Sequence, residues 1–318
     1  MTQHASQHRG QRMSHESVYD GLVEDHGDVS SQWAFGTSFE DPLAGVDTTM
    51  PEGVDGADLA AYCLGLGDDA LVLSHRLSQW CSRAPDLEDD IAVANIALDL
   101  LGQARLLLAR AAAADPAVVP VLAEGSPAPD EDRLAFFREA GELRCTRLVE
   151  LEHGDFAHLV VRLLLFSTAR LALLHRLAGT RDPVLAAIGA KGATEVTYHR
   201  DYAARWVVTL ARGTEESRRR LLAALDELAP WHPEQLDAHP VATRLAQAGA
   251  GVDPAATAEE VEGVLAQVLA EARCSWPDVA PRAGVRGRTG RDGMHTEALG
   301  RMLAEMQVVA RAHPLGRW

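Results

Sequence analysis

The feature that most constrains the fold is the apolar stretch 91–109, IAVANIALDLLGQARLLLA. It carries only two charged residues, Asp99 and Arg105, so the pattern predicts a helix that is buried on nearly all sides. Asn95, Asp99 and Gln103 recur every four residues and therefore share one helix face. Because an unpaired buried carboxylate is costly, Asp99 needs a metal ion or a counter-charge on a neighbouring helix.

Composition narrows the class of protein. Of the 318 residues 47% are hydrophobic, and the net charge of −16 argues against nucleic acid as the main partner. No apolar segment follows a basic start, so no signal peptide is expected. The most apolar segment, 156–178, contains Arg162, Arg170 and Arg176, which argues against a membrane span. The cysteines show no CxxC spacing, which is typical of reduced thiols in the cytoplasm.

Helix start and stop signals predict an all-α chain, since no strand signal and no fixed-period repeat is present. Long helices are expected at 58–80, from an N-cap at Asp86 through the apolar stretch, at 155–178, and at 182–212, where Asp182 precedes a proline. Shorter helices are expected at 133–141, 143–152, 215–228, 241–248, 258–273 and 296–313. The acids at 88–90 fit helix-end electrostatics, with a cation site as the alternative.

These elements divide the chain into two parts. Residues 1–55 lack a sustained period and are expected to form a mostly flexible arm. Residues 56–318 are expected to form one helical domain, with a core bundle at 57–213 and appended helices at 214–318.

Four long helices with inward acids suggest a di-iron carboxylate centre. That site takes one Glu from each of two helices and a Glu-x-x-His from each of the other two. The first helix has Asp68 and Asp69 but no Glu, the second has Asp99 but no His, and the third has no acid from Phe156 onward. The fourth has Glu195, with His199 at i+4 rather than i+3. The ligand count therefore predicts no working di-iron centre in this chain, and with it no metal ligand set.

Lys191 is the single lysine among 30 basic residues and shares a face of the fourth helix with Glu195 and His199. We hypothesise that Lys191 and His199 stand where a metal would be and pair with Asp99 and Glu195. The alternative is a solvated i, i+4 pair of Lys191 and Glu195. The hypothesised network of a vestigial site comprises Asp68, Asp69, Asp99, Lys191, Glu195 and His199.

Four segments carry a resemblance to a known family. They are LGDDALVLSHRLSQWC (66–81), APDLEDDIAVANIALDLLGQAR (84–105), AKGATEVTYH (190–199) and GRDGMHTEALGRMLAEMQ (290–307). In this order they resemble the C subunits of phenylacetyl-CoA epoxidases, which are bacterial multicomponent monooxygenases. The resemblance covers about residues 57 to 318.

The resemblance implies a ferritin-like four-helix bundle and a structural, non-catalytic subunit of the phenylacetyl-CoA 1,2-epoxidase complex in aerobic phenylacetate catabolism. The implied partners are the homologous catalytic A subunit, which holds the di-iron centre, and the other epoxidase subunits. Iron–sulfur, FAD and NADPH belong to a separate reductase component. The location expected from the sequence itself is the cytoplasm, without membrane attachment.

The sequence does not determine which surface docks onto the partner. Candidates are the exposed apolar sides of the first two helices, the last helix, and the Gly/Arg-rich loop 281–293, for which a solvated loop is the alternative. Candidate partner contacts are Arg286, Arg288, Arg291, His295 and Glu297. Two other functions are alternatives to this one. One is a divergent di-metal oxygenase that uses Asp68, Asp99, Glu195 and His199, and the other is a free-standing helical interaction module.

Overall fold

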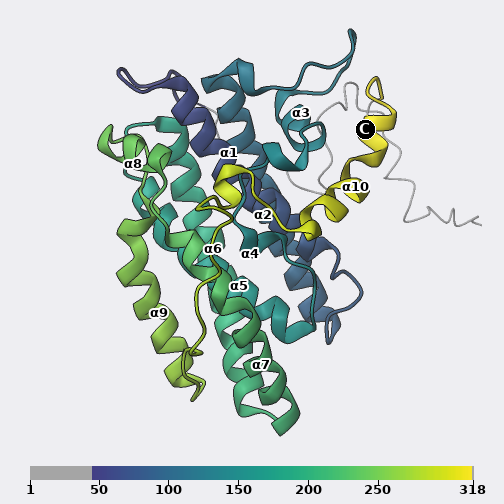
Figure 1. Ribbon diagram of the computed structural model, residues 1–318, viewed down its shortest axis with the longest axis vertical. Coiled ribbons are helices and arrows are strands. Elements are labelled where there is room, and N and C mark those ends of the chain that lie inside the picture. The colour runs from purple at the N-terminus through teal and green to yellow at the C-terminus, as the bar shows by residue number, and fades with distance from the viewer. Residues whose placement is uncertain (1–44, 317–318) are drawn as a thin grey trace, which may run out of the picture. The chain divides into compact units, whose positions relative to one another are not determined.

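Four long helices form the centre of the computed structural model, which describes residues 45–316 (Figure 1). They are α1 (Gly56–Ser78), α2 (Leu87–Ala114), α5 (Phe156–Leu177) and α6 (Pro183–Arg212). α1 packs chiefly on α2, α5 packs chiefly on α6, and α2 also contacts α6. No β-strand occurs within the described range. The prediction of an all-α, ferritin-like bundle is confirmed.

Each long helix begins after an aspartate whose side chain accepts a hydrogen bond from a backbone N–H of the first turn. The caps are Asp55 for α1, Asp86 for α2, Asp155 for α5 and Asp182 for α6. An aspartate at this position satisfies a free N–H group and places negative charge at the positive end of the helix dipole. The predicted caps Asp86 and Asp182 are confirmed, and the first helix begins two residues earlier than predicted.

The helix α5 forms the core of the structure. α2 and α5 are both long and apolar enough to cross a membrane by length and composition alone. The apolar window of α5 is nevertheless 94% buried inside this fold, and that of α2 is 50% buried. Arg162 of α5 is buried too, and it donates to the backbone carbonyls of Leu151 and Glu152. Such burial is typical of the central helix of a helical domain.

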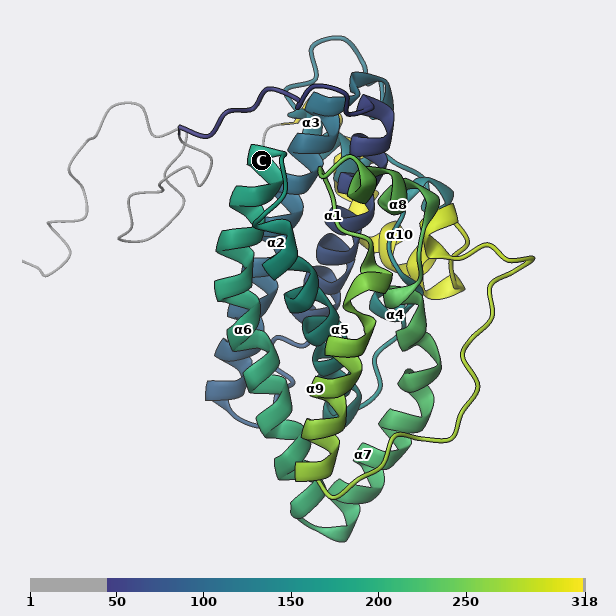
Figure 2. The same cartoon turned by 90° about the vertical axis from the view of Figure 1, so that its left-hand side faces the viewer.

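The helices after α6 pack back onto the bundle. They are α7 (Glu215–Leu228), α8 (Pro240–Gln247), α9 (Ala258–Glu271) and α10 (Glu297–Ala312). α7 and α9 run alongside α5 and α6, as Figure 2 shows, while α8 packs on α1. α10 lies against the short helix α3 (Asp130–Phe136). The bundle is therefore covered by its own C-terminal third over α5 and α6.

The helix predicted at 143–152 is reduced to one turn, α4 (Arg147–Glu150). The residues just before it are extended because their backbone N–H groups bind acids of α1. The N–H of Arg144 donates to Asp68 Oδ2 at 2.8 Å, and that of Thr146 donates to Asp69 Oδ1 at 2.7 Å. A tertiary contact has here replaced the intrahelical hydrogen bonds that the sequence pattern favours.

The predicted N-terminal arm falls mostly outside the described residues. Its last part, 45–55, lies against the bundle, where Arg110 Nη1 donates to the carbonyl of Thr48 at 2.6 Å and Asp55 caps α1. The flexibility proposed for residues 1–44 stays a prediction.

Candidate charge network between the central helices

Polar residues of α2 and α6 pair across the contact between these helices. Nε2 of His199 lies 3.0 Å from Oδ2 of Asp99, and Nε2 of Gln103 donates to Oε2 of Glu195 at 3.0 Å. His199 is fully buried, whereas the Asp99 side chain is partly exposed. Asp99, for which the sequence suggested Lys191 or His199 as a counter-charge, thus meets His199 of α6. We use the name α2–α6 ladder for these two pairs together with the contacts between Asp89 and α6 that are described next.

The ladder continues toward the start of α2 at Asp89. Its Oδ1 accepts hydrogen bonds from Tyr202 Oη and from Trp206 Nε1, both at 2.8 Å. The neighbouring Asp90 accepts from the backbone N–H of Ser82 at 2.8 Å. Two of the three acids at 88–90 therefore bind N–H and O–H donors of other segments, which gives these acids partners without a cation.

Lys191 does not supply the buried counter-charge that the sequence suggested, so the hypothesis is wrong for this residue. Its side chain is 54% exposed, and Nζ lies 3.7 Å from Oε1 of Glu195. This is the solvated i, i+4 pair that the sequence left as the alternative. The physical reason is that the two side chains leave α6 in different directions around the helix axis. His199 points into the bundle, whereas Lys191 lies nearer the rim of the bundle.

The cation at the centre of the bundle is Arg170 of α5. Its Nη2 donates to Oε1 of Gln103 and its Nη1 to the carbonyl of Leu66, both at 3.3 Å. Burial lowers the pKa of Arg170 to about 10, which leaves it charged at neutral pH. Gln103 thus links Arg170 to Glu195. Burial raises the pKa of Glu195, although the hydrogen bond from Gln103 opposes that shift.

The two acids of α1 belong to separate contacts. Asp68 forms a buried, two-pronged ion pair with Arg138, with Nη1 3.0 Å from Oδ2. Asp69 Oδ2 accepts from Arg291 Nη2 at 2.6 Å. The structure therefore does not bring the six residues into one network: four lie along α2 and α6, and two hold connecting segments against α1. Arg170 could have been found from its place in the apolar segment 156–178, whereas the mixed surroundings of Arg138 and Arg291 gave no such signal.

The residues at the bundle centre do not fit a di-iron centre. Such a centre needs carboxylates and histidines that converge from all four helices. Here the acids of α1 bind arginines, α5 contributes Arg170, and only α2 and α6 present an acid–histidine contact, between Asp99 and His199.

A separate cluster of potential ligand atoms lies where α4 meets the start of α10. Cys145, Glu150 and His295 bring a sulfur, a carboxylate oxygen and a ring nitrogen within 4.8 Å of one another. His295 Nδ1 is 2.7 Å from Glu150 Oε2, and the other carboxylate oxygen accepts from the N–H of Thr296 at 2.5 Å. The cluster is thus held together by hydrogen bonds that lock the α10 segment to α4.

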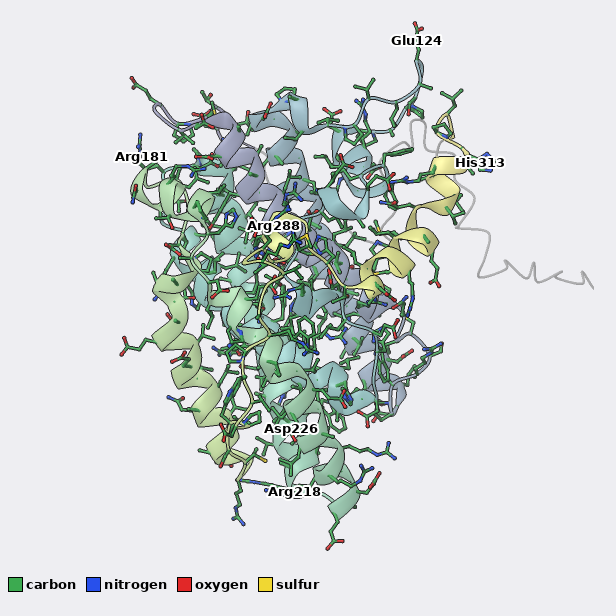
Figure 3. The ribbon with its side chains drawn as sticks, viewed as in Figure 1. Glu124, Arg181, Arg218, Asp226, Arg288 and His313 are labelled. Carbon is green, nitrogen blue, oxygen red and sulfur yellow. The ribbon has the colours of Figure 1, made fainter. Side chains whose placement is uncertain are left out.

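Two of the five candidate partner contacts are internal. The Arg291 side chain is 18% exposed and that of His295 only 5%, because they pair with Asp69 and Glu150. The prediction that these two side chains face a partner is therefore contradicted by their internal contacts. Arg286, Arg288 and Glu297 are exposed, and Figure 3 labels Arg288 on the loop that crosses the front of the bundle.

The His295–Glu150 pair predicts a pH-dependent contribution to stability. Burial lowers the pKa of His295, but Glu150 and the carbonyl of Leu143 outweigh burial, so the pKa lies above its ordinary value of 6.5. The contribution is therefore complete below about pH 6.5 and is lost as the pH rises through the folded-state pKa. We expect His295→Gln to lower the free energy of unfolding more at pH 6 than at pH 9 in urea titrations. An equal loss at both pH values would contradict this charge assignment.

The fold and the α2–α6 ladder define a ferritin-like helical protein with paired polar groups at its centre. The chain belongs to the family of phenylacetic acid catabolic proteins, whose model matches residues 45–318. It is 40% identical to the C subunit of the 1,2-phenylacetyl-CoA epoxidase of Escherichia coli (strain K12) over 261 residues, which are 82% of this chain and 99% of that protein. The resemblance recognised in the sequence is confirmed.

Proposed function

We propose that this chain is a structural subunit of a phenylacetyl-CoA 1,2-epoxidase complex that acts in aerobic phenylacetate catabolism in the cytoplasm. The similarity to a C subunit over nearly that protein's whole length supports the proposal. In this proposal the homologous A subunit holds the di-iron centre and performs catalysis. The iron–sulfur, FAD and NADPH sites lie in a reductase component, and this chain binds none of these cofactors.

The observation that carries the proposal is an exposed apolar face on a helix that is otherwise part of the bundle. We call this the α2 face: Leu87, Ile91, Leu98 and Leu101. Their exposed fractions run from 42% to 69%, and Tyr198 of α6 is also exposed. Full burial of one such side chain contributes about 1.5 to 3 kcal/mol of favourable free energy. A partner that covers the α2 face would therefore bind with a substantial hydrophobic contribution.

The structure narrows the docking candidates that the sequence left open. α1 presents no large exposed apolar side chain, because its apolar residues are covered by the rest of the fold. α10 exposes Val308 and Val309. The α2 face exposes more large apolar side chains than α10, and the loop 281–293 exposes arginines, so we assign to the α2 face the contact with the catalytic A subunit.

Gly102, on α2 beside the α2 face, offers a test of close approach by a partner. A Cβ added there meets nothing within 4 Å, so nothing in this chain requires a glycine, which costs a helix about 1 kcal/mol relative to alanine. We expect Gly102→Ala to raise the melting temperature by about 2 to 4 °C and to weaken binding of the A subunit. Gly263→Ala on α9 is the matched control, because a Cβ there also meets nothing. It should stabilise equally without changing the affinity, and equal affinities for both variants would contradict a close approach at Gly102.

The decisive experiment for the proposed function measures iron and assembly together. The chain is purified alone and after co-expression with its A subunit. We expect a stable complex whose iron content follows the A subunit, and no stoichiometric iron in the chain alone. Near-stoichiometric iron with turnover in the isolated chain would instead establish a di-metal oxygenase, and a monomer without affinity for the A subunit would establish a free-standing module.

A further inference from the structure

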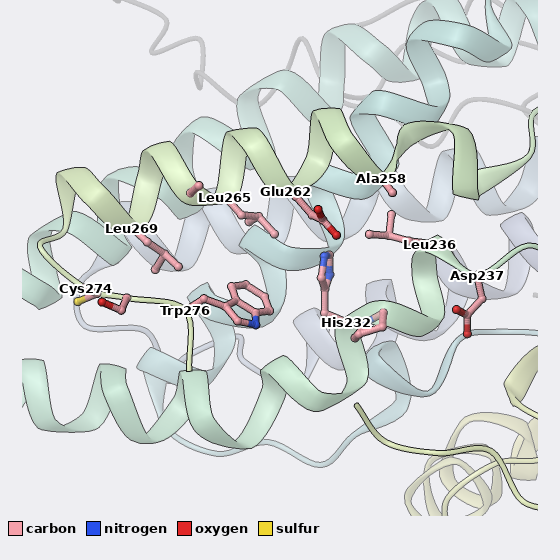
Figure 4. A pocket seen from close by; sticks show the side chains of 12 residues that line it. His232, Leu236, Asp237, Ala258, Glu262, Leu265, Leu269, Cys274 and Trp276 are labelled. Carbon is pink, nitrogen blue, oxygen red and sulfur yellow. The ribbon is translucent and has the colours of Figure 1, made fainter. Parts of the chain in front are cut away.

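A cavity of about 640 Å³ lies between α9 and the turns after α7 (Figure 4). Leu265 and Leu269 of α9 form one wall, Leu236 and Trp276 contribute from the other segments, and no residue of the α2–α6 ladder lines it. Small-molecule sites in proteins are concave, mostly apolar and about 300 to 1,000 Å³ in volume. This cavity has the size and lining of such a site.

The cavity contains a buried hydrogen-bond donor without a partner. His232 is 3% exposed, and its Nδ1 accepts a hydrogen bond from Nε2 of Gln235 at 3.0 Å. The ring proton therefore resides on Nε2, and this atom has no hydrogen-bond partner among residues 45–316. Figure 4 shows the ring directed toward Glu262 on α9. Leaving a buried donor unpaired is costly, so its retention points to a ligand.

The charges around this N–H donor determine which chemical group of a ligand can bind to it. Burial lowers the pKa of His232 to about 4, so the imidazole is neutral at neutral pH and offers an N–H but no positive charge. Glu262 adds a carboxylate at the rim of the cavity. An anionic ligand would be repelled by Glu262, whereas a purely cationic group would offer no acceptor to His232. The matching group is uncharged and both accepts and donates a hydrogen bond, as a hydroxyl does.

An aromatic ring suits the rest of the cavity. The ring of Trp276 lies 5.7 Å from that of His232, at an interplanar angle of 58°, and is 41% exposed. An exposed indole beside a leucine wall offers a flat apolar face to a second ring. We propose that this cavity binds a small aromatic alcohol, whose hydroxyl accepts from Nε2 of His232 and donates to Glu262. This site is separate from the α2 face and goes beyond the proposed function.

The test compares two ligands of similar shape, benzyl alcohol and toluene, by calorimetric titration of the full-length chain. His232→Phe keeps a ring but removes the donor. We expect this variant to weaken benzyl alcohol about 2- to 10-fold without weakening toluene, because one hydrogen bond is lost from one ligand only. An equal change for both ligands, or no binding of benzyl alcohol to the natural chain, would overturn the proposal.

Ala266→Trp provides a second variant that does not touch the donor. Ala266 lines the cavity and is exposed, so an indole there fills the space from the rim without entering the core. Both ligands should lose binding in this variant while the melting temperature is unchanged. Retained binding of benzyl alcohol would place the site elsewhere. Neither variant changes the α2 face, so assembly with the A subunit is unaffected and tests the proposed function separately.

Discussion

Replacing Arg138 with methionine is expected to lower the free energy of unfolding by about 3 to 5 kcal/mol. Arg138 is buried and holds both carboxylate oxygens of Asp68, which is itself fully buried on α1. The variant leaves a carboxylate inside the protein with the N–H of Arg144 as its remaining hydrogen-bond donor among the described residues. The melting temperature should fall by more than about 6 °C. Urea unfolding followed by circular dichroism measures the free energy, and a thermal scan measures the melting temperature.

Lys191→Met is the matched control, since it too replaces a cationic residue with methionine. Lys191 is 54% exposed and its nearest acid is 3.7 Å away, so the expected loss is below about 0.5 kcal/mol. The contrast between the variants distinguishes a buried counter-charge from a solvated one. If Lys191→Met were as damaging as Arg138→Met, the assignment of the two cations would have to be reversed.

Leu98→Glu is expected to weaken binding of the catalytic A subunit by at least about 30-fold, or 2 kcal/mol. Leu98 stands in the middle of the α2 face and is 64% exposed in this chain. A glutamate there stays in water in the isolated chain, but its charge is buried without a partner in the complex. The stability of the isolated chain should therefore change by no more than about 0.5 kcal/mol. Titration of the A subunit with the purified variant measures the affinity.

Two further variants show which surface is responsible. Val121→Glu changes an apolar residue that is 92% exposed and lies outside the α2 face, so we expect the natural affinity. Val308→Glu makes the corresponding change on α10, which also exposes apolar side chains. Unchanged binding by Leu98→Glu together with lost binding by Val308→Glu would move the docking surface from α2 to α10.

The helices were predictable because their signals are local. Asp86 and Asp182 cap the helices they were expected to cap, and the predicted range 215–228 matches α7 at both ends. Helix ends depend on a few neighbouring residues and on the period of the apolar positions. The clearest failure, at 143–152, occurred where distant carboxylates bind the backbone N–H groups, and the helix predicted at 133–141 instead spans Asp130–Phe136.

The pairing of charges was less predictable because it depends on residues far apart in the chain. Spacing alone placed Asp99 and Gln103 on one face of α2, and that face does meet α6. The partner of Asp68 is 70 residues away, and that of Asp69 is 222 residues away. Lys191 drew attention through its rarity, but rarity of a residue type carries no information about burial.

The contact between Asp69 and Arg291 also has a consequence for the order in which the protein is made. α1 is among the first structured elements to leave the ribosome, yet its acid at position 69 meets its cation only after residue 291 has been synthesised. Arg291 also donates to the backbone carbonyls of Gly65 and Arg144, so one late side chain joins α1 to the segment before α4, both of which are made much earlier. Contacts of such long range slow folding, and here they postpone completion of the core to the end of translation. A chain that stops before residue 291 would keep a buried acid without its cation.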